Sequence, residues 1–200
     1  MFIIYGCGGH GRSVADVLID NGEKNIVFVD ENARDGEKIM NIPVIKDMPD
    51  SFSPDDKVIL AIGDNEKRSE VAMNNPDWPY ASAVANDAYV SRFAEIGVGA
   101  FIAHGAYVGP RSVIGEHVII NTHAVVEHDC VVGEFSHIAP GAIMLGNVCI
   151  GMGAYVGGGA TARNNVNITD SVTVGIGAAV VRDITESGIY AGVPICIIKK

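Results

Sequence analysis

Residues 118–141 read VIINTH, AVVEHD, CVVGEF and SHIAPG, four consecutive hexads with an aliphatic third residue. The same spacing extends in both directions, so that residues 88–183 divide into sixteen hexads without a change of register. The first residue is always Ala, Ser, Cys or Val, and the third is Ile or Val in fourteen hexads, with Met144 and Ala162 as exceptions. An unbroken period of six is the signature of a parallel β-helix.

Each hexad predicts one short strand that points its third side chain into the core, with the small first residue at the corner of the coil. Three hexads close a triangular coil, so residues eighteen apart stack on one another. Sixteen hexads make a little over five coils. The repeat therefore predicts an all-β domain over residues 86–200, which ends in a C-terminal tail.

Residues 1–85 instead alternate between strand and helix patterns, which predicts a small parallel sheet with helices packed on it. The expected elements are strands at Phe2–Tyr5, Ile26–Val29 and Val58–Ile62, and helices at Ser13–Asp20 and Glu66–Met73. The predicted fold class is thus an α/β Rossmann-like half domain followed by a parallel β-helix.

Bulk composition narrows the function classes. Of 200 residues, 48% are hydrophobic and 19% are charged, which is typical of a globular protein. The formal net charge of −10 disfavours a nucleic-acid surface, which needs a basic stripe. The four cysteines form no C-x-x-C pair, and no stretch is typical of a membrane span or a secretion leader. We therefore expect a cytoplasmic protein with reduced cysteines.

Glycines at 6, 8 and 11 follow the first strand and fit the G-x-G-x-x-G dinucleotide motif. Asp30 comes nineteen residues after Gly11, where an acidic residue commonly binds ribose hydroxyls. A complete dinucleotide fold needs two mononucleotide halves, and the hexads leave space for one. The sequence therefore disfavours an NAD-dependent oxidoreductase and favours a clamp for the phosphates of one nucleotide.

Five stretches carry a resemblance to a known family: YGCGGHG (5–11), VFVDEN (27–32), AIGDNEKR (61–68), IINTHAVVEHDCVVGEFSHIAPGA (119–142) and YAGVP (190–194). Over nearly its whole length the chain resembles the bacterial sialic-acid/bacillosamine-type sugar O- or N-acyltransferases, a group of hexapeptide-repeat acyltransferases. The resemblance implies a left-handed β-helix, an exception to the usual right-handed crossover. It also implies a homotrimer with acetyl-CoA bound between neighbouring subunits.

The resemblance assigns the chemistry to the EHDC stretch. His128 matches the base that deprotonates the acceptor, and imidazole titrates in the range that this task requires. Asp129 matches the residue that holds the ring, although neighbouring side chains meet only if the chain bends there. Gly146, eighteen residues further on, matches the position whose backbone N–H faces the acetyl carbonyl. A lone histidine would by default be a solvated loop residue, and the surrounding block favours the catalytic interpretation of His128.

The resemblance also assigns binding residues. Gly158 and Ile176 match backbone contacts to CoA, and His137 matches a contact to acetyl-CoA from the adjoining subunit. The expected nucleotide-sugar residues are Gly8, Gly9, His10, Asp30, Glu31 and Gly63, with Asn121 at the acceptor sugar. Asn121 could equally be a structural corner residue.

The implied function is an acetyl-CoA-dependent N-acetyltransferase of glycan biosynthesis, acting on the 4-amino group of a UDP-linked 4-amino-4,6-dideoxy sugar. Two alternatives remain open: O-acetylation of a sialic-acid-type sugar, and a non-catalytic β-helix that binds a nucleotide sugar.

The histidine pattern also raises a zinc alternative. His123 and His128 have the spacing of a zinc pair in γ-type carbonic anhydrases, but residue 87, where the third ligand would stand, is Asp. We therefore expect no metal. His104 and His117 are expected at solvated corners.

Overall fold

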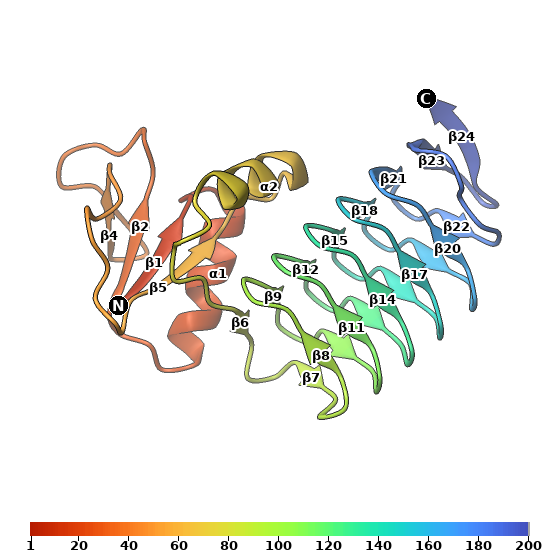
Figure 1. Ribbon diagram of the computed structural model, residues 1–200, viewed down its shortest axis with the longest axis horizontal. Coiled ribbons are helices and arrows are strands. Elements are labelled where there is room, and N and C mark those ends of the chain that lie inside the picture. Colours follow the sequence, from red (N-terminus) through yellow and green to blue (C-terminus); the bar gives the residue numbers. More distant parts are fainter. Residues whose placement is uncertain (200) are drawn as a thin grey trace.

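The structure, a computed structural model, describes residues 1–199, and of Lys199 only the backbone. A small α/β region is followed by a left-handed parallel β-helix (Figure 1). Lys200, with which the predicted second domain ends, lies outside the described residues. Within residues 1–199, no helix has the length and apolar character needed to cross a membrane.

The α/β region contains a five-stranded sheet in the order β3-β4-β2-β1-β5, which is parallel except for β3. Its elements are β1 (Phe2–Tyr5), α1 (Gly9–Asp20), β2 (Ile26–Val29), β3 (Lys38–Ile39), β4 (Ile42–Ile45), β5 (Lys57–Leu60) and α2 (Asn65–Asn74). The β3–β4 hairpin was not predicted, because its turn residues Met40 and Asn41 adopt positive φ without a glycine to signal it.

The glycine motif extends into the first helix. α1 begins at Gly9, four residues before the predicted start, and Gly11 lies inside it. A Cβ at Gly11 would collide with the carbonyl oxygen of Gly6, so only glycine lets the helix approach the first strand this closely. The motif therefore serves the close packing of this helix on the first strand.

Three parallel sheets form the β-helix, and strands eighteen residues apart pair in register. The six-stranded sheet contains β7 (Tyr89–Val90), β10 (Tyr107–Val108), β13 (Val125–Val126), β16 (Ile143–Met144), β19 (Thr161–Ala162) and β22 (Ala179–Val180). The five-stranded sheet contains β8 (Glu95–Ile96), β11 (Val113–Ile114), β14 (Val131–Val132), β17 (Cys149–Ile150) and β20 (Asn167–Ile168). The eight-stranded sheet contains β6 (Ala83–Val84), β9 (Phe101–Ile102), β12 (Ile119–Ile120), β15 (His137–Ile138), β18 (Tyr155–Val156), β21 (Val172–Val174), β23 (Gly188–Ala191) and the antiparallel β24 (Cys196–Lys199).

The third residue of every hexad from Ile102 onward lies in one continuous core, including the two exceptions Met144 and Ala162. The small first residues line this core too, so their predicted place at the corners is wrong. The corners consist of residues four to six, and the sixth has positive φ in fourteen of the sixteen hexads. Its N–H then donates to the coil below, as from Asp129 to the carbonyl of Pro110 at 3.0 Å.

The corners stack into three edges with different chemistry. The His128 edge follows the six-stranded sheet and comprises residues 91–93, 109–111, 127–129, 145–147, 163–165 and 181–183. The acidic edge follows the five-stranded sheet and comprises residues 97–99, 115–117, 133–135, 151–153 and 169–171. The glycine edge follows the eight-stranded sheet and comprises residues 103–105, 121–123, 139–141, 157–159 and 175–177. Because the coil is triangular, the His128 edge lies opposite the eight-stranded sheet.

The α/β region packs on the outer face of the eight-stranded sheet, where Phe101 and Ile119 join a core shared with α1. Arg68 of α2, 1% exposed, spans this junction. Its guanidinium donates to the carbonyl oxygens of Ile62 (2.8 Å), His117 (2.8 Å) and Phe135 (2.7 Å). It forms no ion pair within residues 1–199, so backbone carbonyls stabilise its charge.

Candidate active site

His128 and Asp129 meet at a corner of the β-helix. The φ of +59° at Asp129 turns the chain sharply, and His128 Nδ1 lies 2.8 Å from Asp129 Oδ2. The other carboxylate oxygen of Asp129 pairs with Arg111 Nε at 3.0 Å. The side chain of His128 is 55% exposed, so its ring is held on one side and open on the other. An aspartate at Nδ1 favours the tautomer with a free Nε2, the form that acts as a base.

Gly146 lies one coil above His128 and packs against its ring. A Cβ at Gly146 would lie 2.6 Å from both Cε1 and Nε2 of His128. The backbone N–H of Gly146 donates no hydrogen bond within the described chain. Imidazole and free amide therefore occupy adjacent levels of one column, an arrangement that suits a base beside an oxyanion donor.

Replacing Gly146 with alanine is expected to impair activity with little loss of stability. The new methyl would displace the exposed His128 ring, while the backbone of Gly146 needs no positive φ. We expect kcat to fall about 10-fold or more, as for a misplaced general base, with a nearly unchanged melting temperature. Steady-state kinetics and thermal unfolding check this. A variant with normal kcat would show that the ring position is unimportant.

The two residues matched to CoA contacts lie on the glycine edge. Gly158 and Ile176 stack above Pro140: the N–H of Gly177 donates to Gly158 O at 2.9 Å, and that of Gly159 to Pro140 O at 3.0 Å. The Ile176 side chain is 84% exposed. The glycine edge and the His128 edge border the same six-stranded sheet, so Gly146 and Gly158 lie on its two sides.

His137 lies on the eight-stranded sheet, opposite the His128 edge, and is 8% exposed. Its Nε2 lies 3.0 Å from Asn121 Nδ2, and its ring packs edge-on against Tyr155. His10 on α1 packs edge-on against Phe101, which lies two strands from His137 in the same column of the eight-stranded sheet. The structure thus groups His137 with Asn121 and His10, residues expected at the nucleotide sugar. In one chain it cannot meet His128.

His117 corrects a second expectation. It is 3% exposed, not solvated, because its ring stacks on Phe135 and meets Tyr80 edge-on. His117 is the sixth residue of its hexad, and its positive φ turns the side chain back over Gly99, toward the α/β region. A hexad pattern alone cannot show which corners another domain will cover.

Three buried imidazoles make acid sensitivity a prediction. Burial, with Arg68 nearby, lowers the pKa of His10 to about 3 and those of His117 and His137 to about 4. These values lie below the unfolded value of about 6.5, so unfolding takes up protons in acid. Stability is therefore complete above pH 6.5 and falls toward pH 4, by about 1.4 kcal/mol per pH unit for each histidine.

Denaturant unfolding between pH 7.5 and 4.5 measures this slope. His117→Gln should reduce the slope whatever it does to stability at pH 7.5. An equal slope in the variant would show that His117 does not contribute.

The glycine turn is open at the N-terminus of α1. Gly8 caps the helix without a side-chain bond, the first turn contains no acidic residue, and nothing lies within 4 Å of a Cβ at Gly8 or Gly9. Free N–H groups there suit a phosphate. α2 differs, because Asp64 caps it by accepting from the N–H of Lys67 and Glu66 lies in its first turn. The two helix ends therefore favour opposite charges.

The carboxylate of Asp30 already has partners. Its Oδ2 accepts from Cys7 Sγ (3.1 Å) and Cys7 N (3.4 Å), and its Oδ1 from Asn32 N (3.0 Å). The hydrogen bond from the thiol lowers the pKa of Asp30, while burial and Asp30 raise the pKa of Cys7 to about 11. Asp30 thus braces the glycine turn, and Glu31 beside it is exposed.

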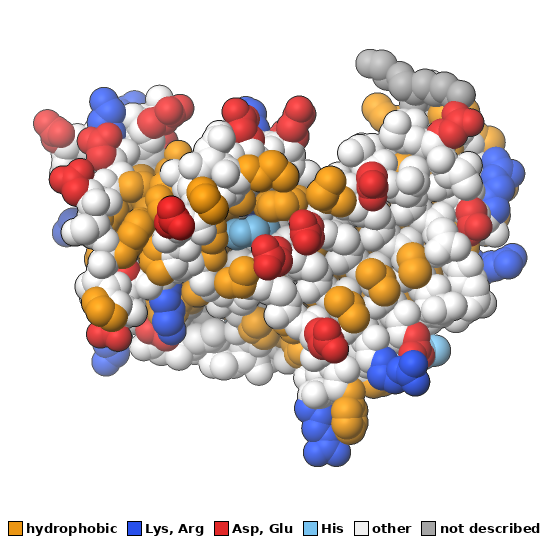
Figure 2. Space-filling view, viewed as in Figure 1, with side chains coloured by type: hydrophobic (Ala, Val, Ile, Leu, Met, Phe, Trp, Pro, Cys, Tyr) orange, Lys and Arg blue, Asp and Glu red, His pale blue; other side chains and the backbone are white. Residues whose placement is uncertain are grey.

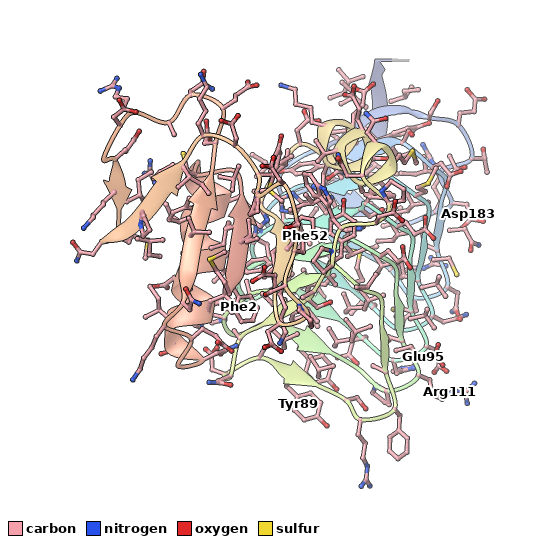
Figure 3. The ribbon with its side chains drawn as sticks, turned by 60° about the vertical axis from the view of Figure 1, so that its left-hand side comes forward. Phe2, Phe52, Tyr89, Glu95, Arg111 and Asp183 are labelled. Atoms are coloured by element: carbon pink, nitrogen blue, oxygen red, sulfur yellow. The ribbon has the colours of Figure 1, made fainter. Side chains whose placement is uncertain are left out.

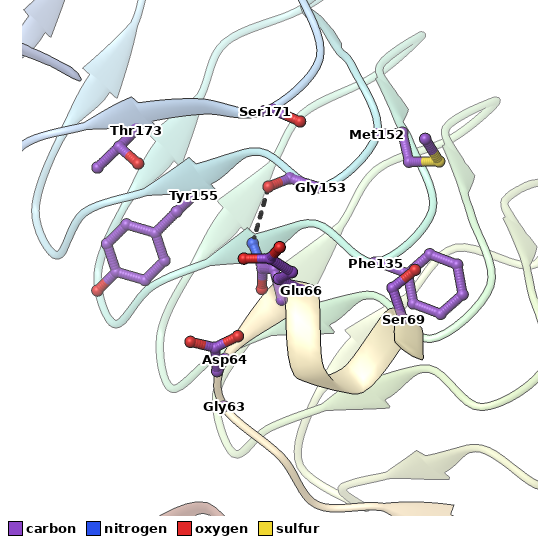
Figure 4. Close-up of a pocket in the computed structure, with 11 residues that line it drawn as sticks. Gly63, Asp64, Glu66, Ser69, Phe135, Met152, Gly153, Tyr155, Ser171 and Thr173 are labelled. Atoms are coloured by element: carbon purple, nitrogen blue, oxygen red, sulfur yellow. Dashed lines mark hydrogen bonds between the residues drawn. The ribbon is translucent and has the colours of Figure 1, made fainter. Parts of the chain in front are cut away.

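A cavity of about 710 Å³ lies between α2 and the eight-stranded sheet, beginning at Gly63 (Figure 4). Asn65 crosses it and donates to Gly153 O at 3.1 Å. The other lining residues include Asp64, Glu66, Ser69, Tyr155, Ser171 and Thr173. Tyr155 and Thr173 were not predicted from the sequence, although both lie in the column of His137, eighteen and thirty-six residues later.

The described residues contain no group of three or more His, Cys, Asp or Glu side chains placed to hold a metal ion. The ring of His123, one half of the zinc spacing, folds over Gly105 instead.

Comparison with known proteins gives two kinds of match, to a family model and to solved structures. Residues 1–74 match the family model of the PglD N-terminal domain. The acetyltransferase domain of PglB from Neisseria gonorrhoeae, which has also been solved with acetyl coenzyme A, is 34% identical over 98% of both chains with a TM-score of 0.94. A variant of perosamine N-acetyltransferase from Caulobacter crescentus, solved with CoA and GDP-perosamine, is 31% identical over 100% of this chain and 97% of that one, with a TM-score of 0.88.

WeeI from Acinetobacter baumannii, 23% identical over 99% of both chains with a TM-score of 0.91, shares the fold. No curated protein sequence matches the chain. Identity above 30% over almost the whole of two sugar acetyltransferases, together with the hexads and the N-terminal match, shows the family. The chain belongs to the hexapeptide-repeat sugar acetyltransferases with a PglD-type N-terminal domain.

Proposed function

We propose that this protein is an acetyl-CoA-dependent N-acetyltransferase acting on the 4-amino group of a nucleotide-linked 4-amino-4,6-dideoxy sugar, with UDP as the nucleotide. The observation that carries the proposal is the column in which His128, oriented by Asp129, lies beneath the free N–H of Gly146. The matched relatives, a PglB domain solved with acetyl coenzyme A and a perosamine N-acetyltransferase, support both the donor and an amino sugar.

In the proposed reaction His128 Nε2 takes a proton from the amine as its nitrogen forms a bond to the thioester carbonyl. The N–H of Gly146 donates to the oxygen that becomes negative. When the carbon–sulfur bond breaks, His128 returns the proton to the leaving thiolate. Asp129 stabilises the imidazolium in between, and the products are an amide and a thiol.

The sugar nucleotide would bind across the half domain, residues 1–85. We place its pyrophosphate at Gly8 and Gly9. Of the two helix N-termini within residues 1–199, that of α1 has no acidic residue in its first turn, whereas α2 has Asp64 as its cap and Glu66 in its first turn. Its sugar would then point past Gly63 toward Asn121 and the cavity, whose charged lining residues are both acidic. Because His128 and His137 lie on opposite sides of one β-helix, we propose that active sites form between subunits of a homotrimer.

Thiol release from acetyl-CoA in the presence of different acceptors tests the proposal. Release should require a UDP-4-amino-4,6-dideoxy sugar and should be absent with the corresponding 4-hydroxy sugar and with free sialic acid. Comparing thiol release with a GDP-linked and a UDP-linked 4-amino sugar tests which nucleobase the enzyme prefers. Turnover on sialic acid alone would replace the proposal with O-acetylation, and no turnover on any acceptor would favour a binding protein.

A further inference from the structure

Basic side chains are confined to one edge of the β-helix. Residues 86–198 contain four arginines and no lysine, and all four belong to the His128 edge: Arg92, Arg111, Arg163 and Arg182. The acidic edge contains Glu116, Glu134 and Asp170 and no Lys or Arg, and the glycine edge contains no Lys, Arg, Asp or Glu. The His128 edge also contains three acidic residues, Glu127, Asp129 and Asp183. Figure 2 shows the basic side chains of the β-helix along its lower and right-hand margin, and Figure 3 shows Arg111 and Asp183 of this edge on one side.

The arginines form two pairs, one on each side of His128. Arg92 and Arg111 lie two and one coils toward the N-terminus, and Arg111 is paired with Asp129. Arg163 and Arg182 lie two and three coils toward the C-terminus, beyond Gly146. Stacked strands are about 4.8 Å apart, so these two guanidinium groups begin roughly 10 and 14 Å from the level of His128.

The C-terminal pair is available to a ligand. Both side chains are exposed, and within residues 1–199 the guanidinium of Arg163 makes no hydrogen bond or ion pair. Arg182 Nη2 makes one long contact of 3.4 Å, to the carbonyl of Ile195. Asp183, the acidic neighbour on the same coil, accepts from the N–H of Asn167 at 2.8 Å. Between His128 and these arginines the edge carries only Leu145, Gly146 and Asn147, which leaves an uncharged path.

This spacing fits one anionic ligand. The pantetheine arm of coenzyme A has about thirteen bonds between sulfur and the first phosphorus, about the backbone length of four residues, which span at most roughly 14 Å. The other expected CoA residues, Gly158 and Ile176, also lie toward the C-terminus from His128, on the glycine edge across the six-stranded sheet. They would therefore meet the same ligand from an adjoining subunit of the proposed homotrimer. From an acetyl group at Gly146 the level of Arg182 is two coils, or roughly 10 Å, away. An arm of this length therefore brings the phosphates to the level of Arg163 and Arg182 without being fully extended.

We propose that Arg163 and Arg182 bind the phosphates of the 3′-phospho-ADP end of coenzyme A. The inference rests on the proposed function, because it takes the acetyl position from His128 and Gly146. Guanidinium groups match phosphate oxygens in geometry and charge, which compensates for the net charge of −10 that would otherwise repel CoA. Arg92 and Arg111 have no part in this site, because they lie beyond His128 in the other direction.

The test uses truncated donors. Arg163→Gln and Arg182→Gln should each raise KM for acetyl-CoA about 10-fold, with kcat nearly unchanged, since each removes a charge-assisted contact. With acetyl-pantetheine, which has no phosphates, both variants should equal the wild type. Acetyl-3′-dephospho-CoA should show which arginine holds the 3′-phosphate. Arg92→Gln, an exposed arginine of the same edge, is the matched control and should change nothing.

Each other outcome overturns the inference. Equal losses with acetyl-pantetheine would mean that the arginines act on the fold. If the variants instead raised KM for the sugar nucleotide, Arg163 and Arg182 would bind the diphosphate of that substrate. If Arg92→Gln raised KM for acetyl-CoA equally, the effect would come from the overall positive charge of the edge and not from a phosphate site. Calorimetric binding of CoA to the wild type separates this from failure of the proposed function: wild type that binds no CoA defeats both, whereas variants that bind it normally defeat only this inference.

Discussion

Substituting alanine for His128 is expected to lower kcat by roughly 10²- to 10⁴-fold while leaving KM for both substrates nearly unchanged. The ring lies beside the proposed reaction centre, and no other imidazole belongs to its column of the edge. Its side chain is 55% exposed, so its removal opens no buried cavity. Stopped assays of amide formation, with a thermal unfolding control, measure the two effects.

The Asp129→Asn variant tests separately whether the carboxylate at His128 Nδ1 contributes to kcat. It keeps a hydrogen-bond partner at His128 Nδ1 but removes the charge and weakens the bond to Arg111, so we expect a smaller loss in kcat than for His128→Ala. A His128→Ala variant with more than a tenth of wild-type kcat would show that another group takes the proton. The assignment of His128 as the base would then be wrong, whereas the membership of the chain in the acetyltransferase family would be unaffected.

The largest effect on stability is expected for Arg68→Met, at about 3 kcal/mol or more. The substitution leaves the carbonyls of Ile62, His117 and Phe135 without their donor at a buried junction, and each such acceptor costs about 1–3 kcal/mol. Removing the buried charge of Arg68 offsets part of this loss of stability. Because the bonds to His117 and Phe135 join α2 to the β-helix, the loss should appear first as release of the α/β region.

Hydrogen exchange of α2 and of β15, compared with the overall melting temperature, measures this loss. Arg12→Met, at an exposed arginine on α1, is the control and should change little. A second readout is the pKa of His137, which burial and the charge of Arg68 lower in the wild type. This pKa should rise in Arg68→Met, because the substitution removes that charge. Unchanged stability together with an unchanged pKa would contradict this role for Arg68.

The repeat made the β-helix predictable in detail, because a period of six with an aliphatic third residue is satisfied by few other structures. Even Met144 and Ala162 occupy the positions that the register assigns. The chemistry of the corners was less accessible. The contact of His128 with Asp129 depends on a left-handed backbone at a non-glycine residue, which residue type alone does not signal.

The junction between the two regions was hardest to predict. Arg68 stands in a polar stretch that gives α2 no clear apolar face, and nothing local indicates that its guanidinium is buried. The burial of His117 and His137 follows from the same docking. Tyr155 and Thr173, by contrast, were within reach, since stacking by eighteen places them over His137.

Because the coil is triangular, the length of an insertion or deletion in the β-helix decides on which edge every later corner lies. A deletion or insertion of eighteen residues removes or adds one complete coil, and every later corner stays on its own edge. A change of six keeps the aliphatic core in register, yet it rotates all later corners by one third of a turn. Arg163 and Arg182 would then face a different side from His128 in an equally well-packed fold. Selection for folding alone would tolerate both changes, and only catalysis would distinguish them.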